Sequence, residues 1–434
     1  MPSVIVAGGG LAGLSTAAAL GSAGYDVDLY ESRAFLGGRA TSYEAPGACD
    51  QSETIDNCQH ILLRCCVNLI DFYERLGVAA DVHFYREFVF LEPGGRASTM
   101  RAGLLPAPLH FAGSFAGLKF LGLADKLAIA RAMLAIRREH ATRADLDQIS
   151  MLAWLREKRQ TERAIQRFWS QVLVSAINED LHRIAARHGF QVFWLAFLAR
   201  SDSWEMGVPI VPLGELYSSS AWERLGSVRL HLRAPVDRFV VEDGAVRCAV
   251  VGDSQRQADH YVSAVPFERL AALAPDVPVP PFTHSPITGI HLWFDRPITD
   301  LPNATLLDRT IQWMYNKSEG RYVQLVVSAS RSLVDKPRTE VIALAVRELA
   351  EFFPAVREAQ LVKAHVVKEV RATFSAAPGT ESQRPTTRTA VSNLFLAGDW
   401  TRTGWPPIME SAVRSGYLAA EAITGRKFLL PDIA

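Results

Sequence analysis

The sequence contains few cysteines, no surplus of charge of either sign and no long uninterrupted hydrophobic run. Its five cysteines include no C-x-x-C pair and leave one unpaired in any disulfide scheme, which favours a reducing compartment over a secreted disulfide scaffold. The 46 basic residues are balanced by 46 acidic ones, so nucleic acid is not an expected partner. The first apolar run begins at Ser3 and leaves no room for a secretory leader, so we expect a cytoplasmic protein.

The nearest approach to a membrane-spanning segment is residues 104–123. Because it contains Pro106, Pro108, His110 and Lys119, it does not fit a spanning helix, which needs about 20 apolar residues. Two interpretations stay open. The segment belongs to an ordinary core, or it is an apolar lid that contacts the inner face of the membrane and makes the protein peripheral to it.

A glycine-rich turn follows the first predicted strand directly. Residues 3–7 are a short β-branched run, residues 8–13 have the G-x-G-x-x-G spacing, and an alanine-rich helix over 14–23 leads to a second strand that ends at Glu31. The first glycine permits the tight turn, the second lets the backbone approach a pyrophosphate, and the third allows close helix–strand packing. The helix N-terminus attracts phosphates, and Glu31 can accept hydrogen bonds from ribose hydroxyls. The predicted dinucleotide contacts are Gly8, Gly10, Ala12, Gly13 and Glu31.

The residues after Glu31 favour FAD over a nicotinamide cofactor. A Leu-Gly-Gly-Arg run over 36–39 offers backbone N–H groups and a bidentate cation to a pyrophosphate. A nicotinamide site has no need of this second element. We therefore predict FAD as the cofactor, with Ser32, Gly38 and Arg39 among its contacts.

A second cofactor-binding segment is predicted near the C-terminus. A strand over 393–398 precedes Asp399, two prolines and a helix over 409–424, which Gly425 ends. Prolines suit the position before a helix because N–H groups there have no partner within it. The helix N-terminus is a good neighbour for an anionic reduced flavin, and Asp399 can accept a hydrogen bond from a ribityl hydroxyl. The predicted contacts here are Gly398, Asp399, Met409, Glu410 and Ala412.

The chain of 434 residues is long enough for at least two domains, and its hydrophobic period changes along its length. Apolar residues recur every three or four positions over about 115–200 and every second position from about 227, where Asp243-Gly244 predicts a hairpin. We predict an α/β fold in which a discontinuous Rossmann-like FAD-binding domain is interleaved with an α+β substrate-binding domain. The FAD-binding domain takes residues 1–85, 205–285 and 385–434, and the substrate-binding domain takes 86–204 and 286–384.

Several motifs together resemble the flavin amine oxidase and phytoene desaturase superfamily. They are the glycine turn, Leu36–Arg39, Phe395–Trp400 and Met409–Gly416. Within this superfamily the chain is most similar to the hydroxysqualene dehydroxylases of bacterial hopanoid biosynthesis, a group also described as squalene-associated FAD-dependent desaturases. The segments that narrow the resemblance are 56–60, 292–297, 312–313, 371–374 and 403–406. The resemblance implies an amine-oxidase-like arrangement of the two domains.

The resemblance also implies a reaction, the reduction of an allylic alcohol. FAD reduced by an external donor such as NADPH passes a hydride to hydroxysqualene, a long apolar isoprenoid; water leaves and squalene forms. The departing hydroxyl needs a proton, and the allylic cation needs an anion or an aromatic face nearby. His60 and Asp56 are the candidates for catalytic roles. The alternatives are that His60 holds the cofactor or backbone and that Asp56 caps a turn.

Further contacts complete the predicted site. We expect Gln59 and Val236 to contact FAD, and we assign no residue to a metal. An aromatic wall is expected around the substrate, with plain core packing as the alternative for each member. Its members are Trp293, Trp313, Tyr315 and Phe374.

Three other functions stay open. A carotenoid-type polyene desaturase would use the same cofactor segments in reverse and remove a hydride from a polyene precursor. An amine oxidase is disfavoured because the final segment has no cysteine for flavin attachment and the sequence offers no obvious aromatic cage. A non-catalytic isoprenoid-binding protein of this fold would bind lipidated partners without flavin, which Glu31, Arg39 and Asp399 argue against.

Overall fold

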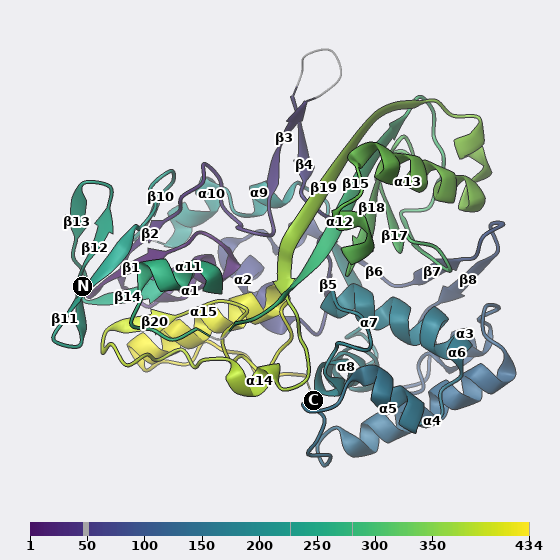
Figure 1. Ribbon diagram of the computed structural model, residues 1–434, viewed down its shortest axis with the longest axis horizontal. Helices are drawn as coiled ribbons and strands as arrows, with labels where there is room; N and C mark the ends of the chain where they lie inside the picture. The colour runs from purple at the N-terminus through teal and green to yellow at the C-terminus, as the bar shows by residue number, and fades with distance from the viewer. Residues whose placement is uncertain (47–51, 226, 280, 434) are drawn as a thin grey trace.

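The protein has two regions built around separate sheets (Figure 1). The computed structural model describes residues 1–46, 52–225, 227–279 and 281–433. The region on the left of Figure 1 contains a five-stranded parallel sheet of order β10-β2-β1-β14-β20. Its strands, which come from three distant stretches of the chain, are β1 Ser3–Ala7, β2 Asp26–Tyr30, β10 Val228–His231, β14 His260–Ser263 and β20 Leu394–Leu396.

Both faces of this parallel sheet are covered, as the apolar composition of its strands requires. On one face, α1 (Leu11–Ser22) and α15 (Met409–Thr424) share a core with Val4 and Val6. The two helices lie close together because Gly416 has no side chain, and a Cβ there would overlap the Ala12 carbonyl oxygen. The other face is covered by α11 Phe267–Leu273 and by a small antiparallel sheet of β11 Arg238–Glu242, β12 Ala245–Val251 and β13 Ser254–Arg256.

The region on the right of Figure 1 contains a seven-stranded sheet of order β19-β15-β18-β17-β16-β7-β8. Neighbouring strands are antiparallel, except that β16 and β7 are parallel. Helix α13 (Arg338–Phe352) covers the face that carries Met314 and Leu325, whereas Trp313 and Tyr315 point to the other face, as alternation along a strand requires. The strands are β7 Phe88–Leu91, β8 Ala97–Met100, β15 His284–Phe294, β16 Asn303–Leu306, β17 Trp313–Ser318, β18 Tyr322–Ser328 and β19 Leu361–Phe374.

A helical layer lies below this sheet in Figure 1 and confirms the helical period predicted for about 115–200. Two of its turns, Ile165–Trp169 and Phe193–Leu198, are π-helical. No helix in the described part of the chain is long and apolar enough to cross a membrane. The helices of the layer are α3 Ala112–Ala116, α4 Leu123–Glu139, α5 Met151–Glu157, α6 Glu162–Ala164, α7 Ser170–Ile177 and α8 Ala186–Val192.

Short elements connect the two regions. The hairpin of β3 Ser42–Pro46 and β4 Ser52–Asp56 projects beside β19 in Figure 1. Strand β9 Met206–Pro209 lies between β5 Leu62–Leu63 and β6 Val82–Tyr85. The remaining helices are α2 Val67–Leu76, α9 Leu213–Leu216, α10 Ser219–Trp222, α12 Arg331–Val334 and α14 Thr380–Gln383, with 3-10 turns at Ala79–Asp81, Glu223–Leu225 and Pro354–Arg357.

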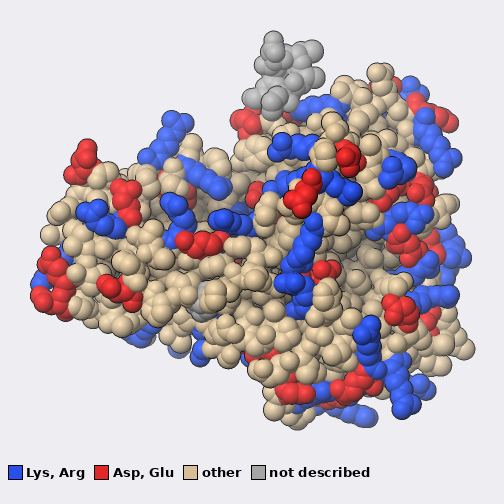
Figure 2. Space-filling model, viewed as in Figure 1, with Lys and Arg blue, Asp and Glu red and all other residues tan. Residues whose placement is uncertain are grey.

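Positive and negative side chains are intermixed on the face in view (Figure 2), and the described cysteines are buried free thiols. Four cysteines, Cys58, Cys65, Cys66 and Cys248, are buried free thiols. Cys49 lies outside the described residues.

Candidate cofactor and active site

A cavity of about 660 Å³ joins the N-terminal and C-terminal segments that were predicted to hold the cofactor. One end is lined by the loop after β1, by residues 37–39 and by the start of α15. The other end is lined by side chains of β7, β17, α7 and α8. The cavity therefore runs from the parallel sheet of one region to the antiparallel sheet of the other.

The glycine turn after β1 has the geometry of a phosphate-binding loop. Gly8 has φ 112°, in the left-handed region, and a Cβ there would lie 2.7 Å from the Ala264 carbonyl oxygen. A Cβ on Gly10 would meet only the Gly38 Cα at 3.7 Å, which is ordinary contact, and both glycine backbones line the same cavity space. Because the first N–H groups of α1 have no acceptor within the helix, they can bind a pyrophosphate in that space.

Glu31 is held at the end of β2 by the loop that it supports. Its side chain is buried, with Oε2 accepting from the Gly9 N–H at 2.7 Å and Oε1 accepting from the Arg33 N–H at 2.8 Å and the Ser32 hydroxyl at 3.0 Å. Glu31 also lines the cavity. The carboxylate keeps further lone pairs for the ribose hydroxyls of a nucleotide.

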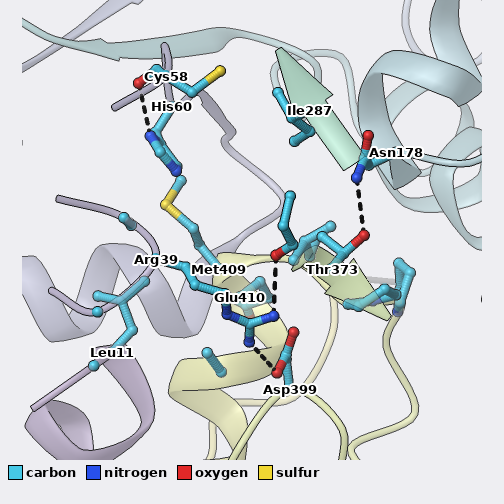
Figure 3. A pocket seen from close by; sticks show the side chains of 18 of the residues that line it. Leu11, Arg39, Cys58, His60, Asn178, Ile287, Thr373, Asp399, Met409 and Glu410 are labelled. Atoms are coloured by element: carbon cyan, nitrogen blue, oxygen red, sulfur yellow. Dashed lines mark hydrogen bonds and ion pairs between the residues drawn. The ribbon is translucent and has the colours of Figure 1, made fainter. Parts of the chain in front are cut away.

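Arg39 and Asp399 connect the two ends of the chain across the cavity (Figure 3). Arg39 Nη2 lies 2.5 Å from Asp399 Oδ1, and Arg39 Nη1 donates to the Ala372 carbonyl at 3.0 Å. The Arg39 side chain is 39% exposed and that of Asp399 is 6% exposed. The pair places one cation and one anion beside the same space, where they can meet a pyrophosphate and a ribityl hydroxyl.

The start of α15 points its free N–H groups at the cavity, while the Glu410 side chain turns away. Met409 and Ala412 line the cavity, and the Glu410 carboxylate accepts from the Asn68 side-chain amide and the Leu69 N–H, both at 2.8 Å. Burial raises the pKa of Glu410, against the lowering effect of these two donors. Glu410 therefore joins α15 to the N-terminus of α2, and its backbone supplies what a flavin would contact.

A buried arginine that the sequence analysis did not single out shapes the C-terminal loop. Arg384 is 1% exposed and donates to Glu381 at 2.6 Å, to the Trp405 carbonyl at 2.6 Å and to the Asp399 carbonyl at 2.8 Å. These partners of the two terminal nitrogens, with the charge of Glu381 among them, stabilise the buried guanidinium, whereas its Nε has no hydrogen-bond partner in the described part of the chain. Nothing in the local sequence pattern distinguishes Arg384 from a surface arginine.

Comparisons with known proteins agree with this geometry. The family profile of flavin-containing amine oxidoreductases matches residues 11–424. The chain belongs to this family. The 15-cis-phytoene desaturase of Synechococcus elongatus is 26% identical over 98% of this chain and 96% of its own length, and the zeta-carotene desaturase of Synechocystis is 24% identical over 97% and 96%. Among solved structures, putrescine oxidase bound to putrescine has a TM-score of 0.73 at 16% identity and covers 98% of this chain and 99% of its own.

This flavin oxidoreductase binds FAD, and its residues fit the cofactor at both ends. Gly13 does not line the cavity; a Cβ there would overlap the Gly8 carbonyl oxygen, so its part is the close packing of α1. The predicted contacts that do line the cavity are Gly8, Gly10, Ala12, Glu31, Ser32, Gly38, Arg39, Gln59, Val236, Gly398, Asp399, Met409, Glu410 and Ala412.

His60 lines the cavity as a neutral ring. Its Nδ1 lies 2.9 Å from the Cys58 carbonyl oxygen (Figure 3), and because a carbonyl only accepts, that nitrogen carries a proton. Burial lowers the pKa of His60, although the charge of Asp56 and the Cys58 carbonyl act to raise it. A neutral imidazole is a better proton acceptor than donor near pH 7.

Asp56 does not reach the cavity, and here the predicted catalytic role needs correction. It ends β4, it is buried, and its Oδ1 accepts from the Ser42 hydroxyl at 2.7 Å and from the Leu213 N–H at 2.9 Å. The second bond satisfies a free donor at the start of α9. Asp56 thus holds the β3–β4 hairpin against α9, the capping alternative considered from sequence.

The predicted aromatic wall is half present. Trp313 and Tyr315 line the cavity with ring centroids 5.7 Å apart, and the Trp313 indole donates to the Ser175 hydroxyl at 2.8 Å. Trp293 stacks on Tyr322 at 4.3 Å under the β3–β4 hairpin, outside the cavity. Phe374 is also outside it, and packs against Phe282 at 5.1 Å in the core that the five-stranded parallel sheet shares with α11. Phe374 is therefore a core residue, and Trp293 is a half-buried residue packed outside the cavity.

The apolar end of the cavity contains residues that sequence reasoning missed. The aromatic and β-branched run of β7 was a usable signal, because it reads as a short buried strand. The π-helical turn that ends at Leu198 gives no such sequence signal. The missed residues are Phe88, Phe90, Met100, Leu195 and Phe197.

Proposed function

We propose that this protein exchanges a hydride between FAD and a long, apolar isoprenoid. One observation carries the proposal: a single cavity begins at the FAD contacts and ends among the aromatic and aliphatic side chains of β7, β17 and α8. Such an end suits a hydrocarbon chain, because burying apolar surface stabilises the complex by about 25 cal/mol per Å². Bound FAD supplies the hydride acceptor or, once reduced by an external donor such as NADPH, the hydride donor.

Desaturation of a polyene precursor is the direction that the curated relatives support. The two cyanobacterial relatives act, by their names, on phytoene and zeta-carotene and align over almost the whole chain. Loss of a hydride leaves a carbocation, which forms a double bond when a base removes a neighbouring proton. The neutral His60 ring lines the cavity and suits that acceptor role better than a donor role.

Reductive dehydroxylation of hydroxysqualene to squalene is the second candidate, and a specific feature of the cavity favours it. Gln171 and Thr305 line the cavity, and their buried Oε1 and Oγ1 atoms have no hydrogen-bond partner in the described part of the chain. A hydrocarbon would leave both oxygens unpaired, at about 1–3 kcal/mol each. A substrate hydroxyl would donate to either oxygen, so this feature supports an alcohol substrate.

Two assays on the same purified holoprotein test the direction. In the first, the oxidised holoprotein receives phytoene with a quinone as electron acceptor, and a longer conjugated product is followed by absorbance. In the second, the anaerobically reduced holoprotein receives hydroxysqualene, and squalene is measured by mass spectrometry together with flavin reoxidation. Product in the first assay alone supports desaturation, and product in the second alone supports dehydroxylation. A fully FAD-loaded protein that gives neither product contradicts both.

A further inference from the structure

An outward-facing leucine surface covers the apolar end of the cavity. We call this surface, residues 101–138, the leucine surface. Six of the 12 large hydrophobic side chains exposed in the described residues lie on it, although scattered single exposures are the norm. Leu104 is fully exposed and Leu123 is 75% exposed. The other four are Leu105, Leu109, Leu127 and Leu134.

Helix α4 presents two apolar faces, only one of which the protein covers. Ile129, Ala132 and Ile136 are buried against the core. Leu123, Leu127 and Leu134 are exposed, and steps of four and seven residues place them on one stripe along the opposite face. A helix that is apolar on its solvent side fits an amphipathic helix that lies in a membrane interface.

The leucine surface is positively charged, which suits a bilayer that contains anionic lipids. The surface carries six cations and one carboxylate in a chain whose net charge is zero. That carboxylate, Asp125, is buried and accepts from the Gly122 N–H at 2.7 Å. None of the six cations has an ion-pair partner within the described residues, while the neighbouring Glu139 is bound by Arg143 and Lys158. The cations are Arg101, Lys119, Lys126, Arg131, Arg137 and Arg138.

The leucine surface backs directly onto the cavity. The Phe111 ring lies 6.0 Å from that of Phe197, and the Phe120 ring lies 5.1 Å from that of Phe90. Phe197 and Phe90 both line the cavity at its apolar end. The leucine surface therefore packs on the cavity wall through Phe111 and Phe120, so a bilayer on this surface would lie next to that end.

We propose that the leucine surface docks on the anionic surface of a phospholipid bilayer. The leucines enter the interface and the cations contact lipid phosphates. Docking does not depend on the proposed function; only its consequence, that a lipid-soluble substrate enters from the bilayer, rests on it. The structure extends the segment predicted from sequence, because the stripe continues along α4 beyond residue 123.

Flotation of the FAD-loaded full chain with vesicles tests this proposal. We expect binding to vesicles of phosphatidylcholine with 30% phosphatidylglycerol, at least tenfold weaker binding to pure phosphatidylcholine, and release at high salt. Changing Leu123, Leu127 and Leu134 together to Ser should weaken binding at least tenfold, and so should changing Arg131, Arg137 and Arg138 to Gln. The exposed Leu232 and Val362 lie elsewhere, so their changes to Ser serve as the matched control and should leave binding intact.

Three results would overturn docking. They are a wild-type protein that stays unbound with both vesicle types, equal binding by the leucine variant, and a dimer that the leucine variant dissociates while vesicles bind nothing. Flavin absorbance and melting temperature confirm that each variant is folded. Turnover on detergent-dispersed substrate should be unchanged in the leucine variant, so a failure of the proposed function is recognised separately from a failure of docking.

Discussion

Arg39 and Asp399 are 360 positions apart in the chain, and their side chains form an ion pair of 2.5 Å. Both line the cavity that holds the cofactor. The pair joins the loop after the first βαβ unit to the loop after the last strand of the parallel sheet. The cavity therefore lies between two segments that only the folded chain brings together.

Removing either partner of this pair should weaken FAD binding. Arg39→Ala takes away a charge-assisted donor to the pyrophosphate, and such bonds contribute about 1.5–3 kcal/mol. We expect a roughly 10- to 100-fold higher Kd for FAD, measured by flavin fluorescence titration. Arg238→Ala, an exposed change on β11, is the control. Wild-type FAD affinity in both Arg39→Ala and Asp399→Ala would rule these residues out as cofactor contacts.

Gly10 and Gly13 should fail in different ways when each is changed to Ala. Gly10 has φ −80° and ψ 176°, which Ala adopts, and its Cβ would meet only the Gly38 Cα at 3.7 Å. Gly10→Ala should therefore keep its stability without FAD and lose FAD affinity at least tenfold. At Gly13 a Cβ would overlap the Gly8 carbonyl oxygen, so Gly13→Ala should lose about 1–3 kcal/mol of stability. Urea unfolding of FAD-free protein and FAD titration separate the two effects; equal destabilisation of both variants contradicts the argument.

The predictions from sequence that the structure confirms rest on local chemistry. Helix α15 begins at Met409 and ends at Thr424 as expected, because prolines precede it and Gly425 follows with φ 72°. Asp243 and Gly244 both have positive φ in the turn between β11 and β12, which is the conformation that a two-residue hairpin needs. In each case a few neighbouring residues determine the element.

The features of the site that could not be predicted from the sequence depend on which distant element covers a side chain. Trp293 and Trp313 were both predicted to belong to the aromatic wall, yet only Trp313 lines the cavity, because the β3–β4 hairpin covers Trp293. Asp56 is close to His60 in sequence, but its carboxylate accepts a hydrogen bond from the Leu213 N–H at the start of α9. Strand β19 went unpredicted because charged residues interrupt its alternation, and its pairing with β15 determines its course.

Stability should fall in acid partly through His188. Burial lowers the pKa of His188 to about 3, and the nearby charges of Arg384 and Arg187 lower it further, whereas an unfolded histidine titrates near 6.5. Between about pH 6.5 and 3 the unfolded chain binds a proton at His188 that the folded chain does not bind. The free energy of unfolding therefore falls as the pH drops through that range. We expect His188→Gln to remove about 1 kcal/mol of the loss between pH 7.5 and 5.5. Urea unfolding at both pH values measures it, and an identical loss in the variant contradicts the assignment.

The unpaired oxygens of Thr305 and Gln171 offer a test of whether the substrate is a hydrocarbon or an alcohol. Thr305 is the cross-strand partner of Trp313, and Gln171 lies one turn of α7 from Ser175, which accepts from the Trp313 indole. Thr305 and Gln171 therefore belong to elements that both contact Trp313 in the cavity wall.

Thr305→Val and Gln171→Leu remove these oxygens with little change of shape. If the substrate is an alcohol, each change should raise KM for hydroxysqualene about 5- to 100-fold, the equivalent of about 1–3 kcal/mol. KM for phytoene should be unchanged, and thermal stability should be equal or higher because an unpaired buried oxygen is gone. Gln166→Leu, an exposed change one helical turn away, controls for surface effects. Unchanged kinetics with hydroxysqualene in both variants would remove the argument for an alcohol and leave desaturation as the function that the cavity supports.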